Sequence, residues 1–289
     1  MLARPRGDAW RLEHLGEHVL RHAADVTDRA SIEELVERVA PEWLFHLASF
    51  GNYSWQVDAS RIAAVCVVGT VNLLEAARAA GVRAFVHAGS SSEYGFKDHP
   101  PAESEAVRPT TAYGAAKAGA TLQCAAAARA QDAHIVTLRL YSAYGPWEDP
   151  RRLFPTLIRH GLSRALPPLV DPNTARDFVH VDDVSRAFTL AAEYEDLPRG
   201  SVYNVGSGRQ TTLADIVSLA RQHFGITAAP RWGTEPPRVW DTACWVSDPS
   251  AIEQALGWRA SISLDRGLEQ MVRWLRDQPV AVRSERYEC

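Results

Sequence analysis

The stretch Tyr113-Gly114-Ala115-Ala116-Lys117 brings a phenol and an ammonium to one face of a predicted helix. Residues i and i+4 of an α-helix lie on the same side, so the two side chains can meet at one site. A nearby ammonium favours the phenolate, which suits a tyrosine to proton transfer near neutral pH. Of the 8 tyrosines, only Tyr113 has a lysine four residues later, and Lys97 is the one other lysine of the chain. The pair predicts an acid–base site.

The composition of the 289 residues is that of a globular protein, with 46% hydrophobic and 23% charged residues. A net charge of −4 gives no reason to expect binding to nucleic acid or to an anionic membrane. The four cysteines form no CxxC pair, and we find neither an uninterrupted apolar run of membrane-spanning length nor a signal peptide, so we expect a cytoplasmic protein. His14, His18 and His22 are evenly spaced, but Gly16 interrupts them, and we predict no metal site.

Strand and helix patterns alternate through the first half of the chain. Apolar runs indicate strands at 19–24, 43–48, 84–88 and 135–140, with helical patterns between them. This alternation predicts an α/β fold with a parallel sheet covered on both faces. After residue 146 the elements become shorter and the loops richer in proline. We therefore predict two domains, 1–146 and 147–289, with parts of 177–205 packing back on the first.

Hydroxyl-bearing residues follow the predicted strands at one edge of the sheet. Ser90 follows the strand at 84–88, Tyr113 opens the next helix, and Tyr141 follows the strand at 135–140. In an open parallel sheet, ligands bind at the carboxyl ends of the strands. These residues are therefore predicted to share a ligand site with Lys117. No Gly-x-Ser-x-Gly elbow surrounds Ser90, which argues against a serine hydrolase.

A series of motifs along nearly the whole chain resembles the extended short-chain dehydrogenase/reductase family. Its members are epimerases, dehydratases and ketoreductases that act on nucleotide sugars. The motifs are Phe45-His46-Leu47-Ala48, Gly69-Thr70-Val71-Asn72-Leu73-Leu74-Glu75-Ala76, 90–95, 113–117, Tyr144-Gly145-Pro146, 175–184, Tyr203-Asn204-Val205-Gly206 and Leu256-Gly257-Trp258.

The resemblance implies a catalytic set of Ser90, Tyr113 and Lys117. Tyr113 is expected to be the general acid/base, Lys117 to lower its pKa and hold the nicotinamide ribose, and Ser90 to hydrogen-bond the reacting oxygen. The implied cofactor is NAD(P), and Arg4 favours NADP(H) over NAD, because arginine accommodates the 2′-phosphate. The positions that match cofactor-binding residues are Arg4, Asp25, Val26, Leu47, Ala48, Ser49, Tyr113, Lys117 and Tyr141.

The implied substrate is a nucleotide sugar. Arg176 and Arg238 match positions that hold the nucleotide diphosphate, a task suited to a guanidinium fork. Ser91, Ser92 and Ser142 match positions beside the sugar. Dehydratases of the family carry Asp-Glu where this chain has Ser91 and Ser92, so elimination is not expected.

What remains is 4-ketoreduction of a nucleotide-bound deoxy- or dideoxy-4-ketohexose, as in ketoreductases of the CDP-abequose synthase type. The alternative is 4-epimerisation. The helices near 57–79 and 113–130 match those that pair in dimeric relatives, which implies a homodimer.

One family feature has no counterpart in the sequence: no Gly-x-x-Gly-x-x-Gly turn precedes Asp25. We interpret Gly206-Ser207-Gly208 as a structural turn. The prediction is a Rossmann-like doubly wound sheet that lacks its first strand and glycine-rich turn, with a smaller C-terminal α/β substrate lobe. In it, the strand at 19–24 has no neighbour and the strand at 43–47 is an exposed edge.

Two explanations of this difference are open. The true start lies upstream of Met1, or the chain is truncated and a poor enzyme. In the second case the chain is a nucleotide-sugar binding or dimerising protein. Weak binding of NADP(H) by the 289-residue product is expected.

Overall fold

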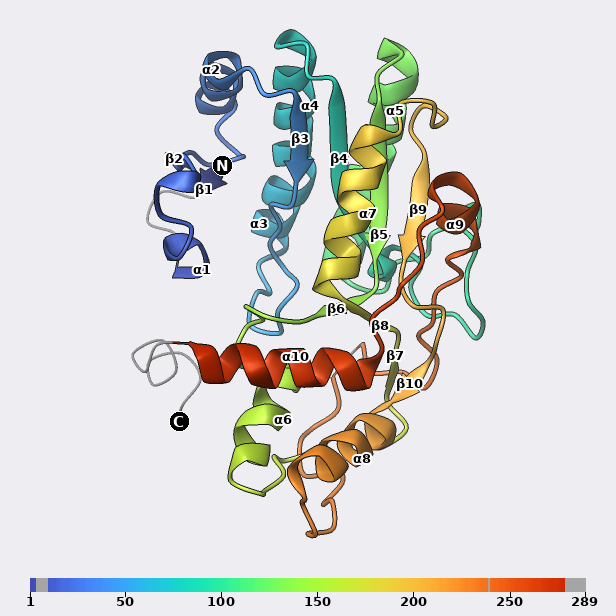
Figure 1. Ribbon diagram of the computed structural model, residues 1–289. Coiled ribbons are helices and arrows are strands. Elements are labelled where there is room, and N and C mark those ends of the chain that lie inside the picture. Colours follow the sequence, from blue (N-terminus) through green and yellow to red (C-terminus); the bar gives the residue numbers. More distant parts are fainter. Residues whose placement is uncertain (4–9, 239, 279–289) are drawn as a thin grey trace. The chain divides into compact units, whose positions relative to one another are not determined.

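The computed structural model describes residues 1–3, 10–238 and 240–278. The chain divides into two units. The first contains Met1–Gly95, Glu103–Arg139 and Phe188–Tyr203, and the second contains Phe96–Ala102, Leu140–Ala187 and Asn204–Cys289. The helices α1 to α10 and the strands β1 to β10 are labelled in Figure 1.

The central sheet consists of four strands in the order β3-β4-β5-β9. They are β3 (Trp43–His46), β4 (Ala84–Ser90), β5 (Ile135–Leu140) and β9 (Val202–Val205). β3 and β4 are parallel, with His46 opposite His87 in register. Every residue of β4 is buried, as expected for a strand that is covered on both faces. The α/β fold with a parallel sheet confirms the predicted fold class.

A separate pair of short parallel strands precedes the central sheet in the chain. β1 (Leu2–Ala3) pairs with β2 (His22–Ala23), with Leu2 opposite His22 and Ala3 opposite Ala23. The prediction that the strand at 19–24 has no neighbour is therefore wrong. The strand is shorter than predicted, and its partner lies in an arginine-rich segment without a readable strand pattern.

Large apolar side chains on β3 and just after it are exposed. Within the described residues β3 pairs with β4 alone, so it is an edge strand, as predicted. Phe45 is 40% exposed, and Leu47, just after the strand, is 61% exposed.

The helices of the first unit pack around α4. α2 begins after Asp28, whose carboxylate caps the helix by accepting a hydrogen bond from the Ser31 N–H at 3.2 Å. Its apolar face joins α4 and β4 in one core cluster. The helical elements are α1 (Trp10–Glu13), η1 (Gly16–His18), α2 (Arg29–Val39), α3 (Ala59–Ala63), the π-helical η2 (Ala64–Val68), α4 (Gly69–Ala79), η3 (Ser91–Glu93) and α5 (Ala112–Gln131).

Residues 59–79 form a continuous helical stretch of 21 residues. By length and composition this stretch could cross a membrane, although the sequence shows no uninterrupted apolar run of that length. Half of its most apolar window is buried in the protein, and it packs against both α2 and α5.

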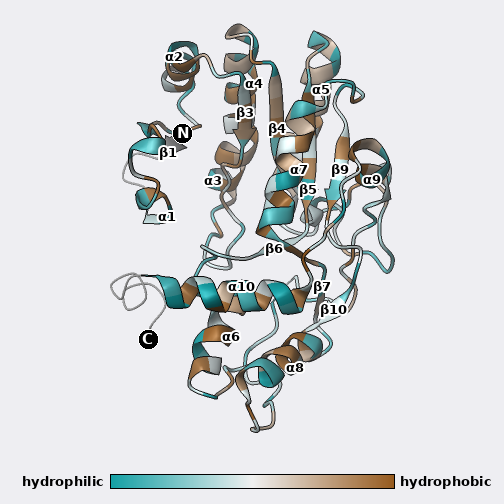
Figure 2. Ribbon diagram, in the orientation of Figure 1, coloured by the Kyte–Doolittle hydropathy of each residue, from teal (hydrophilic) through white to brown (hydrophobic). Residues whose placement is uncertain are grey.

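In the described part of the chain, the second unit contains two small sheets and the helices α6, α8, α9 and α10. It also contains the first part of α7. The sheets pair β6 with β8 in parallel and β7 with β10 in antiparallel fashion. Figure 2 shows teal and brown alternating along α10, whose apolar residues form its buried face. The elements are β6 (Ser142–Tyr144), α6 (Leu153–Leu162), β7 (Ala175–Arg176), β8 (Phe178–His180), α7 (Val181–Glu193), β10 (Thr211–Thr212), α8 (Leu213–Phe224), α9 (Ser250–Leu256) and α10 (Leu264–Asp277).

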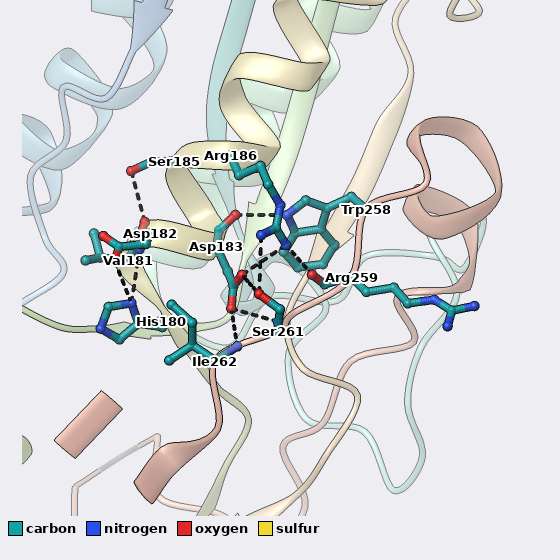
Figure 3. Close-up of polar contacts among 10 residues, drawn as sticks. All are labelled: His180, Val181, Asp182, Asp183, Ser185, Arg186, Trp258, Arg259, Ser261 and Ile262. Atoms are coloured by element: carbon teal, nitrogen blue, oxygen red, sulfur yellow. Dashed lines mark hydrogen bonds and ion pairs between the residues drawn. The ribbon is translucent and has the colours of Figure 1, made fainter. Parts of the chain in front are cut away.

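A buried carboxylate connects α7 to the segment before α10 (Figure 3). Asp183 is 0% exposed and accepts hydrogen bonds from Ser261 N at 2.9 Å, Ser261 Oγ at 2.8 Å and Ile262 N at 3.0 Å. Arg186 forms an ion pair with it at 2.9 Å, and the Trp258 indole N–H donates to its backbone carbonyl at 2.9 Å. These contacts give Asp183, the second of the two consecutive aspartates in 175–184, a structural role within this unit.

A second buried carboxylate supports the Gly206-Ser207-Gly208 turn. Asp177 is 0% exposed and accepts hydrogen bonds from Ser207 N at 2.7 Å and Gly208 N at 3.0 Å. Gly208 has a φ of +70°, which favours glycine. The turn is held by the protein's own carboxylate, in agreement with its interpretation as structural.

Candidate functional site

The predicted catalytic residues lie where β4 ends and α5 begins. Ser90 is the last residue of β4 and is 8% exposed. Tyr113 lies in the first turn of α5 and is half-buried. Thr111 caps this helix, because its hydroxyl accepts a hydrogen bond from Gly114 N at 3.0 Å. The end of β4 and the start of α5 thus carry the two hydroxyl groups of the predicted catalytic set.

Lys117 connects α5 to β4. Its side chain is 2% exposed, and its ammonium donates a hydrogen bond to the carbonyl oxygen of Ala88 at 2.8 Å. Ala88 precedes Ser90 by two residues on β4, so this bond fixes the helix against the strand that carries Ser90. An ammonium has three N–H donors, and Ala88 uses one of them.

The first turn of α5 approaches the backbone after β4 so closely that the residue between Tyr113 and Ala115 has to be small. A Cβ atom on Gly114 would lie 2.4 Å from the carbonyl oxygen of Ser92, closer than real Cβ contacts. The glycine of the Tyr113–Lys117 motif therefore lets the helix approach η3. In the same segment, Ser90 Oγ accepts a hydrogen bond from Ser92 N at 3.2 Å.

Two buried histidines of the central sheet, His46 in β3 and His87 in β4, lie close to the Lys117 side chain of α5. Burial and the Lys117 charge lower the pKa of His46 to about 3, and they also lower the pKa of His87. The Thr70 hydroxyl donates to Cys66 O at 2.6 Å, so in its 2.9 Å contact with His46 Nε2 it is the acceptor. His46 is therefore neutral with its proton on Nε2.

Neither ring nitrogen of His87 has a hydrogen-bond partner within the described part of the chain. The ring centroids of His87 and His46 are 5.1 Å apart. Sequence reasoning did not select these two histidines as site residues. The signal was available, because each interrupts an apolar strand pattern.

The remaining predicted cofactor residues of the first unit have different environments. Val26 is 5% exposed, belongs to the core, and its carbonyl accepts a hydrogen bond from Asn72 at 2.9 Å. Asp25 accepts from the Thr27 N–H at 2.9 Å. Leu47, Ala48 and Ser49 follow the carboxyl end of β3. Arg4 lies outside the described residues.

The donor set fits the nicotinamide end of the implied cofactor. Lys117 can give further N–H donors to ribose hydroxyls, and the phenol of Tyr113 and the hydroxyl of Ser90 can exchange or hold a proton. The pyrophosphate end of the cofactor is held in such proteins by a motif of a strand, a glycine-rich turn and a helix. Within the described residues, no such motif precedes β3.

The predicted substrate residues lie in both units. Ser91 is buried and Ser92 half-buried in η3, in the first unit. The substrate residues Ser142, Arg176 and Arg238 belong to the second unit, as does Tyr141, which is predicted to bind the cofactor. Ser142 N donates to Asp177 O at 2.9 Å, which joins β6 to the segment that carries Arg176.

The two predicted phosphate-binding arginines of the second unit meet at one carboxylate. Asp241 accepts a hydrogen bond from the Arg176 guanidinium at 3.1 Å and another from the Arg238 backbone N–H at 2.8 Å. Burial lowers the pKa of Arg176, and the charge of Asp241 opposes this effect. The guanidinium also lies 5.5 Å from the ring centroid of Trp245. Sequence reasoning missed Asp241, which orients Arg176.

The comparisons with known proteins agree with this arrangement. A family model described as the NAD dependent epimerase/dehydratase family matches residues 3–206. The UDP-glucose 4-epimerase of Mycolicibacterium smegmatis is 31% identical over 264 residues, which cover 88% of this chain and 82% of that protein.

Two solved structures share the fold over most of both chains. The UDP-glucose 4-epimerase of Thermotoga maritima with UDP-glucose has a TM-score of 0.83 at 27% identity, covering 94% of this chain and 88% of that one. The UDP-glucose 4-epimerase of Thermus thermophilus in complex with NAD has a TM-score of 0.82 at 26% identity, covering 95% and 89%.

Proposed function

Because the chain belongs to the NAD-dependent epimerase/dehydratase family, we propose that it exchanges a hydride and a proton at C4 of a nucleotide sugar. The observation that carries this proposal is the contact of α5 with β4. The Lys117 ammonium is bonded to Ala88 O at 2.8 Å, one helical turn from Tyr113 and two residues from Ser90. A phenol, an ammonium and a hydroxyl so placed suit proton transfer at a carbinol or carbonyl oxygen.

Each of these residues has a role that its chemistry supports. Tyr113 takes the proton from the sugar hydroxyl during oxidation and returns it during reduction. Ser90 Oγ hydrogen-bonds the same sugar oxygen and holds it near the phenol. The buried Lys117, whose ammonium spends one N–H on Ala88 O, offers its other N–H donors to the nicotinamide ribose. When bound, the nicotinamide supplies or accepts the hydride.

The residues after Ser90 favour a redox reaction without elimination. A 4,6-dehydratase needs an acid and a base beside the sugar to remove a hydroxyl and a neighbouring proton. Ser91 and Ser92 are neutral hydroxyl residues, and Ser91 is 6% exposed. The nearest carboxylate in the sequence, Glu93, is 0% exposed and hydrogen-bonded within the protein.

For the net reaction we propose 4-ketoreduction, with 4-epimerisation as the second candidate because similar proteins carry that activity in their names. The two differ in stoichiometry. A ketoreductase consumes one reduced cofactor for each product formed, whereas an epimerase converts substrate with a catalytic amount of cofactor. Absorbance at the nicotinamide band, recorded beside product formation with NADH and then with NADPH, distinguishes the reactions and tests the proposed preference for NADP(H).

For the substrate we propose a nucleoside diphosphate sugar held through Arg176 and Arg238. The support is the shared carboxylate: Asp241 keeps the Arg176 guanidinium and the Arg238 backbone together. A fork of N–H donors matches the paired oxygens of a diphosphate. Trp245, beside Arg176, adds an aromatic surface.

We also propose that the chain forms a homodimer through the helices of 57–79 and 113–130. Large apolar side chains are exposed on these helices and just before the first of them: Val68 is 50% and Leu122 64% exposed, and Val57, two residues before α3, is 79% exposed. Covering apolar surface of this kind is a common reason for self-association. Sedimentation velocity should give a dimer, and Val68→Lys with Leu122→Lys should give a monomer. A wild-type chain that sediments as a monomer at micromolar concentration would contradict the proposal.

A different class of function is a nucleotide-sugar binding protein without turnover. The variant Tyr113→Phe, which removes one hydroxyl oxygen and leaves the ring, distinguishes an enzyme from such a binding protein. An enzyme loses turnover with this change while nucleotide binding persists, whereas a binding protein shows no turnover in either form.

A further inference from the structure

Glu93 is a fully buried carboxylate that is not among the predicted site residues. It ends η3 and is 0% exposed. Carboxylates are buried in this way only when hydrogen-bonded or paired with a charge. Its Oε1 atom accepts from Ser90 N at 2.8 Å and from Thr121 Oγ1 at 3.0 Å, and its Oε2 atom accepts from Arg139 Nε at 2.8 Å.

The partners of Glu93 come from three elements around the site. Ser90 ends β4 and is itself a predicted catalytic residue. Thr121 lies on α5, one turn beyond Lys117 and two turns beyond Tyr113, so the three residues share one face of the helix. Arg139 lies in β5. One side chain therefore connects the strand end that carries Ser90 to the helix that carries Tyr113 and Lys117.

The surroundings hold Glu93 in one place. A Cβ atom on Gly89 would lie 2.8 Å from its Oε1 atom, so the carboxylate packs directly on the backbone before Ser90. Arg139, 5% exposed, donates a further hydrogen bond to the Tyr94 hydroxyl at 2.8 Å. Its guanidinium also lies over the Tyr94 ring, 4.5 Å from the centroid. The ion pair has little freedom to shift.

We propose that Glu93 is a positioning residue: by holding the Ser90 backbone N–H against α5 and β5, it sets where the Ser90 hydroxyl stands relative to Tyr113. This inference rests on the proposed function. The carboxylate acts through Ser90 and takes no part in proton transfer itself. A displacement of about 1 Å in a reacting group can cost roughly 10²-fold in rate, which gives the expected scale.

Two double variants separate positioning from general stability. Glu93→Gln with Arg139→Gln keeps an oxygen acceptor for Ser90 N and Thr121, while the two amides bond to each other. Glu93→Leu with Arg139→Met replaces the pair by apolar side chains of similar length, an exchange that buried ion pairs often tolerate in stability. Both lose the Arg139 contact with Tyr94, so they are matched except for the oxygen that accepts from Ser90 N and Thr121 Oγ1.

Two readouts are compared in the full chain. The first is hydrogen–deuterium exchange of the backbone at 88–94, which needs no substrate. The second is kcat and KM for the nucleotide sugar. The Leu/Met pair should lose protection at Ser90 and lose roughly 10- to 100-fold in kcat, with KM within about twofold. The Gln/Gln pair should keep protection and stay within about threefold of wild type in kcat.

Equal kcat losses in the two pairs, or unchanged protection at Ser90 in the Leu/Met pair, would overturn the proposal. If the Leu/Met pair does not fold, Thr121→Val and Thr121→Ser replace it. The valine should lower kcat and the serine, which keeps the hydroxyl, should restore it; equal rates in these two variants contradict the role of Glu93. If wild type turns over no nucleotide sugar, the proposed function fails, while the exchange data still decide whether Glu93 holds Ser90.

Discussion

Replacement of His46 by glutamine should make the protein less sensitive to acid. His46 is 2% exposed, and burial, with a smaller contribution from Lys117, lowers its pKa from 6.5 to about 3. Between these two values the unfolded chain binds a proton at His46 and the folded chain does not, so the free energy of unfolding falls as the pH falls. From neutral pH to about pH 4.5, this one group should remove roughly 2.7 kcal/mol.

Urea unfolding of wild type and His46→Gln, followed by far-UV circular dichroism from about pH 8 to pH 4.5, measures this difference. Glutamine keeps an N–H donor for the Thr70 hydroxyl and cannot titrate in this range. The difference at pH 8 reports packing alone, because the imidazole is then neutral in both states, and it serves as the internal control. The wild-type curve should fall more steeply by about 1.4 kcal/mol per pH unit below pH 6. Parallel curves would refute the reasoning, because His46 would then titrate equally in both states.

Two further substitutions test the candidate site. Gly114→Ala should lower the free energy of unfolding by about 1–3 kcal/mol, because the new Cβ atom would lie 2.4 Å from the Ser92 carbonyl oxygen. Gly119→Ala is the control: its Cβ atom would lie 3.5 Å from the nearest atom, so this change should be neutral or stabilising. Thermal unfolding compares the two, and equal shifts would argue against the close approach. Arg176→Ala should weaken binding of a nucleoside diphosphate by roughly 30-fold in calorimetry, and Arg176→Lys should not restore it, since the fork of donors is lost. Full affinity in the lysine variant would show that charge alone suffices.

Local sequence patterns predicted the elements that carry the site. The strand at 135–140 and the helix that begins at Tyr113 were both predicted at nearly their observed positions. Their signals are strong because a buried parallel strand is mostly apolar and an alanine-rich segment has high helix propensity. The i, i+4 spacing of Tyr113 and Lys117 then follows from helix geometry, and the contact of Lys117 with β4 required the structure.

Long-range pairings were harder to predict. The pairing of β1 with β2 joins two-residue strands, too short for any periodicity to be read. Glu93 and Arg139 are 46 residues apart in the chain, and a sequence does not state which charges are buried together. The available signal was Arg139 itself, because a charge within an otherwise buried strand requires a partner. The neighbouring positions of His46 and His87 likewise depend on the register of β3 and β4.

The most direct test of the central claim is the turnover of Tyr113→Phe on a 4-keto nucleotide sugar with reduced cofactor, measured beside wild type. Calorimetry first establishes that the two proteins bind the nucleotide equally well. The proposed role of Tyr113 as proton donor predicts that kcat falls by roughly 10²- to 10⁴-fold while the dissociation constant for the nucleotide stays unchanged. A phenylalanine variant that turns over at the wild-type rate would contradict it.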